Sequence, residues 1–86
     1  MFKNKSILIT GGTGSFGKKF IHTICKSYFK QIRKLIIFSR DELKQSELAE
    51  KYNEKKFPFI RFFIGDVRDK DRLNKALKDV DIVVHA

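Results

Sequence analysis

The stretch Thr10-Gly11-Gly12-Thr13-Gly14-Ser15-Phe16-Gly17 decides the fold of this chain. Its glycines at positions 11, 14 and 17 have the spacing G-x-x-G-x-x-G, and the short apolar run Ile7-Leu8-Ile9 comes just before them. Glycine lets a backbone turn sharply and approach a ligand closely, and the first N–H groups of a helix attract phosphate. The stretch therefore predicts a strand-to-helix turn that binds a dinucleotide pyrophosphate, an interpretation that depends on the rest of the chain because glycine-rich turns are common.

Short apolar runs alternate with segments of helical periodicity along the whole sequence. The apolar runs, which predict buried strands, are residues 5–10, 35–38, 59–64 and 82–84. The helical segments are residues 15–29, 42–53 and 70–78, and Asp41 and Asp69 are the expected N-caps of the last two. This alternation predicts an α/β fold with right-handed crossovers, in which helices cover both faces of a parallel sheet. The glycines on the first crossover then select a partial Rossmann fold of about four strands in the order 3-2-1-4.

The fourth expected strand, residues 82–84, is the most apolar stretch of the C-terminal region and lies at an edge of that sheet. An unpaired apolar edge strand favours association, so we expect homo-oligomers that form through this strand. A complete Rossmann unit continues with at least one more helix and strand. We therefore expect residues 1–86 to be the N-terminal half of a cofactor-binding domain, without a substrate domain.

The composition indicates one small globular domain, with 86 residues, 42% hydrophobic and 34% charged. Nineteen Lys and Arg against ten Asp and Glu give a net charge of +9, which suits a phosphate-bearing ligand. The cations are scattered in short pairs such as Lys18-Lys19 and Lys55-Lys56, without the aromatic alternation of an RNA-binding module. We therefore expect no nucleic-acid partner.

Other features of the sequence predict a cytoplasmic location. Cys25 is the single cysteine, so it forms no internal disulfide, and no Cys/His cluster has the spacing of a zinc site. The N-terminal residues are polar, and the apolar run at residues 7–10 is too short for a signal sequence or a membrane span. We expect no metal and no membrane contact.

The residues after the second expected strand indicate which dinucleotide binds. In dinucleotide-binding domains, an acidic side chain about 20 residues past the glycines holds the ribose 2′-hydroxyl, whereas an arginine there accommodates a 2′-phosphate. Ser39 and Arg40 lie at about this distance beyond Gly17, and Lys44 follows one helical turn later. The pattern predicts NADP as the cofactor. Asp41 keeps NAD as the alternative, because its carboxylate suits a 2′-hydroxyl.

Gly65, Asp66 and Val67 follow the third expected strand. Ligands gather at the carboxyl ends of strands in open α/β sheets, and a carboxylate beside a backbone N–H suits the edge of an adenine. Capping of a local turn is the alternative for Asp66.

Two other features invite a catalytic interpretation. Tyr52 and Lys56 have the Tyr-x-x-x-Lys spacing of short-chain dehydrogenases, but they precede the third strand, on the adenosine side or facing solvent. A catalytic pair must reach the nicotinamide, so we interpret this spacing as coincidence. His85 follows the fourth strand, and we expect it to pack under the next turn rather than act as a general base.

Several motifs together resemble a known enzyme family. Residues 7–17 resemble the start of an extended short-chain dehydrogenase/reductase. Residues 39–45 (SRDELKQ), 62–69 (FFIGDVRD) and 84–86 (VHA) resemble the inverting UDP-N-acetylglucosamine 4,6-dehydratases and related polysaccharide-biosynthesis dehydratases. The resemblance covers essentially the whole chain. It implies a bacterial NADP-dependent enzyme that removes water from a UDP-sugar, in the biosynthesis of surface polysaccharide or flagellin sugars.

The family's pattern assigns cofactor contacts to four groups of residues. These are Gly11, Thr13, Gly14, Ser15, Phe16 and Gly17 at the pyrophosphate; Ser39, Arg40, Asp41 and Lys44 at the adenosine ribose and its phosphate; Asp66 and Val67 at the adenine; and Ala86 beside the nicotinamide. The family's catalytic Asp, Lys and Tyr, and its UDP-sugar domain, lie beyond residue 86. The resemblance therefore assigns no catalytic residue, and we expect the chain by itself to be inactive. The alternatives are a free-standing nucleotide-binding or regulatory module and, third, a basic nucleic-acid-binding domain.

Overall fold

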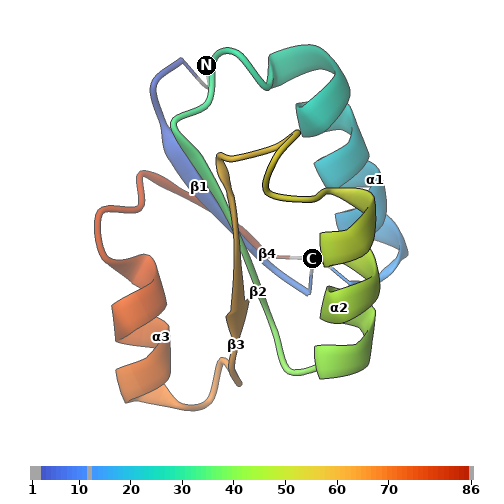
Figure 1. Cartoon of the computed structure of the whole chain (residues 1–86). Coiled ribbons are helices and arrows are strands. Elements are labelled where there is room, and N and C mark those ends of the chain that lie inside the picture. The colour runs from blue at the N-terminus through green and yellow to red at the C-terminus, as the bar shows by residue number, and fades with distance from the viewer. Residues whose placement is uncertain (1–2, 12, 86) are drawn as a thin grey trace.

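The computed structural model describes residues 3–11 and 13–85, and every expected strand and helix is present among them, with shifted ends (Figure 1). The strands are β1 (Ser6–Thr10), β2 (Lys34–Ser39), β3 (Ile60–Ile64) and β4 (Ile82–His85). The α-helices are α1 (Ser15–Thr23), α2 (Glu42–Lys51) and α3 (Lys70–Leu77), and a π-helical segment, η1 (Ile24–Tyr28), follows α1.

The strands form one parallel sheet in the order β3-β2-β1-β4, which confirms the expected Rossmann arrangement. The register sets Thr10, the last residue of β1, opposite both Phe38 and His85, and sets Ser39 opposite Ile64. All four strands therefore end at the same edge of the sheet. Whatever follows the strands is brought together there.

Helices cover both faces of the sheet, as expected: α1 and α2 lie on one side and α3 on the other (Figure 1). Ile7, Ile9 and Ile37 pack toward α1 and α2, whereas Leu8 and Phe38 pack toward α3. This alternation follows from the two-residue period of a strand. Each of these side chains is almost fully buried, which stabilises the fold by about 1.5–3 kcal/mol per residue.

The first helix differs from its expectation. Apolar residues recur every four positions and predict one continuous α-helix over residues 15–29, but α1 ends at Thr23 and the chain continues as η1. The i→i+5 bonds of a π-helix widen the turn, and in this segment the neighbours Ile24 and Cys25 are both buried. Packing against the sheet thus overrides local periodicity. Burial raises the pKa of the Cys25 thiol to about 11, so this packed thiol is protonated and unreactive at neutral pH.

The fourth strand lies at an edge of the sheet, as expected. The N–H of Asp81 donates to the Ser6 carbonyl at 2.8 Å. Backbone groups alternate in direction along a strand, so the N–H and C=O groups of Val83 also face β1. Those of Ile82 and Val84 therefore point outward, away from β1. The Val83 side chain is 53% exposed. This edge therefore combines outward-facing backbone groups with exposed apolar surface.

Candidate functional site

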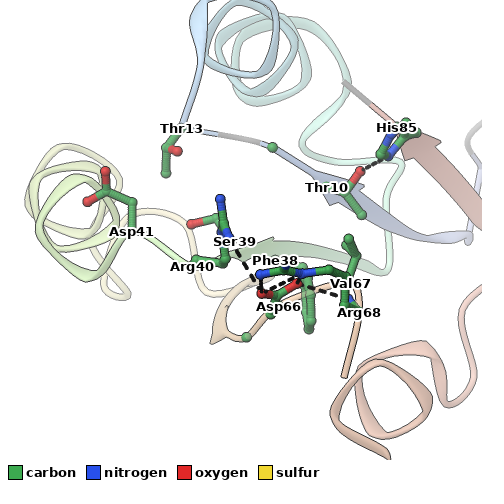
Figure 2. A pocket seen from close by; sticks show the side chains of 12 residues that line it. Thr10, Thr13, Phe38, Ser39, Arg40, Asp41, Asp66, Val67, Arg68 and His85 are labelled. Carbon is green, nitrogen blue, oxygen red and sulfur yellow. Dashed lines mark hydrogen bonds and ion pairs between the residues drawn. The ribbon is translucent and has the colours of Figure 1, made fainter. Parts of the chain in front are cut away.

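A hollow of about 490 Å³ lies where the four strands end (Figure 2). It is the position at which open α/β sheets bind their ligands. The residues that line it are Thr10, Gly11, Thr13, Phe38, Ser39, Arg40, Asp41, Gly65, Asp66, Val67, Arg68 and His85. They come from the ends of β1, β2 and β4 and from the turns that follow β1, β2 and β3.

The glycine-rich turn forms the wall beside β1. Gly11 has φ +68°, a left-handed conformation that favours glycine, and its N–H donates to the Phe38 carbonyl at 3.2 Å. The Gly14 N–H donates back to the Gly11 carbonyl at 3.1 Å, and the Gly14 carbonyl accepts from Lys18 N at 2.9 Å. Gly14 is the N-cap of α1 and supplies no side-chain cap. The first N–H groups of such a helix have no intrahelical acceptor, which suits an anion.

The turn after β2 contributes an exposed cation. Asp41 is the N-cap of α2, as expected, and its carboxylate accepts from the Lys44 backbone N–H at 3.0 Å. Arg40 lies between this cap and the end of the strand, with its side chain 71% exposed. The Lys44 side chain does not line the hollow. The carboxylate at this turn is therefore engaged, and the neighbouring guanidinium is largely exposed at the hollow.

The turn after β3 contains the strongest charge interaction of the hollow. Asp66 accepts from the Arg68 backbone N–H at 2.9 Å and from its guanidinium at 2.7 Å, and Arg40 Nη1 lies 3.5 Å away (Figure 2). These hydrogen bonds and the charge of Arg68 hold the pKa of the Asp66 carboxyl well below its ordinary value of 3.8, and Arg40 adds to the effect. The hydrogen bonds to Asp66 and the negative charge of Asp66 in turn raise the pKa of Arg68. Asp66 is thus ionised and caps its own turn, and it remains open to a ligand because it lines the hollow.

Comparison with known proteins places this arrangement in a family. A family model described as polysaccharide biosynthesis protein matches residues 7–86. The chain belongs to this family. A UDP-N-acetylglucosamine 4,6-dehydratase (inverting) of Campylobacter jejuni is 56% identical over 86 residues, which are 100% of this chain and 24% of that protein. A UDP-glucose 4-epimerase of Rickettsia bellii is 47% identical over 87 residues, which cover 100% of this chain and 25% of that protein.

A solved structure supports the same conclusion. The dTDP-glucose 4,6-dehydratase of Bacillus anthracis, in complex with NAD, superimposes with a TM-score of 0.79 at 26% identity, over 94% of this chain and 26% of that one. The expected resemblance to sugar-nucleotide dehydratases is therefore confirmed. The chain spans about a quarter of the length of the curated relatives it matches.

Gly65 determines how closely the elements around the hollow pack. A Cβ at this position would lie 2.7 Å from Phe38 Cζ and 2.8 Å from Arg72 Cγ. The Phe38 ring is buried and stacks on Phe63 with ring centroids 5.7 Å apart, so a Cβ at position 65 would have to displace a packed core ring. Glycine at this position thus lets the turn that carries Asp66 lie directly on the core.

Gln45 is a buried residue that sequence reasoning did not single out. Its Nε2 donates to Ser39 Oγ at 3.1 Å and to the Phe63 carbonyl at 3.1 Å, with longer contacts to the Ile37 and Ser39 carbonyls. The amide therefore ties the end of β2 to the end of β3. Its Oε1 has no hydrogen-bond partner among the described residues. A glutamine in an amphipathic helix gives no sequence signal of this role.

His85 lines the hollow, whereas Tyr52 lies in the core rather than on the adenosine side or facing solvent as expected. The Thr10 hydroxyl and His85 Nδ1 are 2.6 Å apart, and His85 is exposed (Figure 2). The turn under which His85 is expected to pack lies outside the described residues, so that packing stays a prediction. Tyr52 is buried in the core beneath α2, edge-on to Phe57 at 5.4 Å between ring centroids. It does not line the hollow, which agrees with the interpretation of the Tyr-x-x-x-Lys spacing as coincidence.

The structure brings together part of the predicted site. Seven predicted residues line the hollow: Gly11, Thr13, Ser39, Arg40, Asp41, Asp66 and Val67. Five others do not: Gly14, Ser15, Phe16 and Gly17, which begin α1, and Lys44, in the first turn of α2. Ala86 lies outside the described residues. Arg68 is the main functional candidate that sequence reasoning missed; its position two residues after Asp66, where an aspartate caps a turn, is the available signal.

Membrane-spanning helices and clusters of metal-binding side chains are both absent from the described part of the chain. Within it, no helix has the length and apolarity needed to cross a membrane. Nor do any three His, Cys, Asp or Glu side chains within it gather in a way that would hold a metal ion.

Proposed function

We propose that this chain binds NADP, with the adenosine half of the cofactor in the hollow. One observation carries the proposal: the glycine turn after β1, Arg40 after β2 and Asp66 after β3 converge on a single hollow at the carboxyl edge of the sheet. In this arrangement the turn and the start of α1 bind the pyrophosphate. Asp66 and the Val67 N–H bind the edge of the adenine.

Arg40 supports NADP over NAD. Its guanidinium is exposed, permanently charged and suited to a phosphate. Asp41, the residue that would favour NAD, already accepts a hydrogen bond from the α2 backbone. The Bacillus anthracis dehydratase is in complex with NAD, so the relatives support a nicotinamide dinucleotide and Arg40 supports the 2′-phosphate.

Calorimetric titration with NADP⁺ and NAD⁺ tests this proposal, because the two ligands differ only in the 2′-phosphate. We expect tighter binding of NADP⁺, and we expect Arg40→Gln to lower its affinity about tenfold while leaving NAD⁺ nearly unchanged. Arg61→Gln is the matched control, since Arg61 is an exposed arginine on β3 outside the hollow. Equal affinities in the wild type, or binding of neither ligand, would contradict the proposal.

A titration with duplex DNA at two salt concentrations separates the nucleic-acid alternative. A DNA-binding protein shows an affinity that falls steeply with salt. We expect no such binding, because the exposed cations of this chain are distributed over many elements.

For the whole protein, we propose that residues 1–86 form the N-terminal NADP-binding part of a UDP-N-acetylglucosamine 4,6-dehydratase for surface-polysaccharide or flagellin sugar biosynthesis in the cytoplasm. The 56% identity to the Campylobacter jejuni dehydratase over the full chain supports this activity. The Rickettsia bellii epimerase supports a UDP-sugar as the substrate class and gives epimerisation as the alternative. Among the described residues, no tyrosine lines the hollow, so we expect no turnover of UDP-N-acetylglucosamine by these 86 residues with NADP⁺. A dehydrated product would contradict this expectation.

We also propose that the 86-residue chain self-associates through β4. Ile82 and Val84 present outward-facing backbone groups beside the exposed Val83, which is a surface that pairs readily. Sedimentation at high concentration tests this. We expect a dimer that Val83→Lys converts to a monomer, and a stable wild-type monomer would contradict the proposal.

A further inference from the structure

Two guanidinium groups of the hollow share one carboxylate. Of the described acidic residues that line it, Asp41 is engaged as the cap of α2 and Asp66 faces both arginines. Arg68 Nη2 lies 2.7 Å from Asp66 Oδ2, and Arg40 Nη1 lies 3.5 Å from the same oxygen (Figure 2). Arg68 is therefore the close partner and Arg40 the distant one.

Arg68 occupies most of the acceptor positions of Asp66. The Oδ1 atom accepts from the Arg68 backbone N–H at 2.9 Å and from Arg68 Nε at 3.1 Å. The Oδ2 atom accepts from Nη2 at 2.7 Å and from the same Nε at 3.2 Å. A carboxylate has about four lone-pair positions, so Arg68 alone engages both oxygens, and Arg40 approaches Oδ2 only as a more distant charge.

We propose that Arg68 is a positioning residue that engages the Asp66 carboxylate, keeps Arg40 as its more distant partner and thereby leaves Arg40 available for a phosphate of the ligand. This inference rests on the proposed NADP function, in which that group is the ribose 2′-phosphate. Without Arg68, the nearest cation to Asp66 is Arg40, and a bidentate pair between them would compete with the phosphate for the same guanidinium. Arg68 thus affects cofactor choice without contacting the group that distinguishes the cofactors.

The same arrangement affects the base. An adenine amino group that reaches Oδ2 shares this oxygen with Arg68 and lies on the side that Arg40 approaches at 3.5 Å. Binding of the adenine and release of Arg40 toward the phosphate are therefore coupled.

A mutant cycle tests the inference by calorimetric measurement of the NADP⁺-to-NAD⁺ affinity ratio in the 86-residue chain. We expect Arg68→Gln to lower this ratio about three- to tenfold, because Arg40 becomes paired with Asp66. We expect the double variant Arg68→Gln, Asp66→Asn to return the ratio close to the wild-type value, because no carboxylate remains to hold Arg40. Lys70→Gln controls for the loss of one nearby positive charge and should leave the ratio unchanged. Arg68→Lys, which keeps the charge but not the two-pronged contact, should fall between wild type and Arg68→Gln.

Each outcome of this cycle either supports or overturns the inference. An unchanged ratio in Arg68→Gln, with folding verified by circular dichroism, overturns it. A low ratio that Asp66→Asn does not restore also overturns it, because Arg68 would then contact the phosphate directly or act through the shape of the turn. If Arg68→Gln does not fold, the comparison of Arg68→Lys with Arg68→Lys, Asp66→Asn distinguishes the same outcomes. A wild-type protein that does not prefer NADP⁺ refutes the proposed function itself and the inference with it.

Discussion

Two arginines flank β2, one just before the strand and one just after it, and they are used in opposite ways. Arg33 donates to Ser6 Oγ at 3.0 Å and to the Asp79 carbonyl at 3.2 Å, and it lies 3.5 Å from Asp81. Among the described residues, the side chain of Arg40 has a single charged partner, Asp66, at 3.5 Å. The arginine at the amino end is satisfied by its own chain, and the arginine at the carboxyl end is left available.

The difference shows that polar groups at the amino ends of the strands stabilise the fold, whereas those at the carboxyl ends are placed to bind a ligand. At the amino ends of the strands, Arg33 and Asp81 complete a network around the buried Ser6, whose N–H donates to the Asp81 carboxylate at 2.8 Å. At the carboxyl ends, the polar groups line a hollow instead. In a parallel sheet ligands approach the carboxyl ends, so unsatisfied groups there are useful, whereas at the other end they would only cost stability.

Gln45 is a structural residue at the carboxyl end of the sheet, where most polar groups line the hollow. Gln45→Glu replaces a donor amide by a carboxylate that faces carbonyl oxygens in a buried site, and we expect a loss of about 3–5 kcal/mol in the free energy of unfolding. Urea denaturation measures this loss. Gln31→Glu makes the same change at an exposed position and should be nearly neutral. Similar stabilities of the two variants would show that the Gln45 amide does not hold β2 and β3 together.

Gly65 is the second structural residue at the binding end. Gly65→Ala forces a Cβ against the buried Phe38 ring, and we expect a destabilisation of about 1–3 kcal/mol. Gly14→Ala is a matched control, because its Cβ would meet only the Gly11 carbonyl at 3.5 Å, an ordinary contact. Thermal unfolding of both variants should separate them, and equal melting temperatures would contradict the proposed close packing.

Separate replacement of Arg33 and of Arg40 by glutamine tests whether the two ends of β2 have different roles. We expect Arg33→Gln to destabilise the protein by about 1 kcal/mol, reduced by its partial exposure, without changing the NADP⁺-to-NAD⁺ affinity ratio. Arg40→Gln should do the reverse, changing the ratio and leaving the free energy of unfolding within about 0.5 kcal/mol of wild type. If Arg40→Gln unfolds the protein as readily as Arg33→Gln, the two ends of β2 do not divide their roles.

The smallest expected effect concerns Asp66 and pH. Pairing with Arg68 lowers the pKa of the Asp66 carboxyl below 3.8 in the folded state, so ionisation of this group stabilises the fold above that pH. The stabilisation is lost as the pH falls through the lowered pKa. We expect the difference in melting temperature between wild type and Asp66→Asn to be constant from about pH 5 to pH 7 and to shrink below about pH 4. Asp71→Asn, an exposed change in α3, serves as the control.

The sequence was sufficient to predict the order of the strands and the position of the hollow. Strand and helix periodicity indicated β-α-β alternation, and chirality rules then allow few sheet orders. The glycine turn located the ligand edge, and the expected caps Asp41 and Asp69 each accept from a backbone N–H at the start of a helix. These features depend on local rules that the residues themselves obey.

Other features depend on tertiary contacts and could not be predicted locally. The change from α1 to η1 depends on burial against the sheet. The role of Gln45 depends on carbonyl groups from two strands, and the tight position of Gly65 depends on the Phe38 ring. Arg68 is one of many exposed cations in the sequence, and only its 2.7 Å contact with Asp66 separates it from the others.

The single thiol of the chain has a practical consequence. The thiolate is the form of cysteine that attacks alkylating reagents, and Cys25 is buried at the junction of η1 and the sheet with a pKa raised to about 11. The folded protein should therefore resist labelling at neutral pH, and each modified molecule reports an opening of the α1 side of the core. The rate of labelling by a neutral reagent, followed by intact mass, would measure the free energy of that local opening without an engineered probe. Addition of NADP⁺ should slow it if the ligand at the distant edge stabilises the same helix.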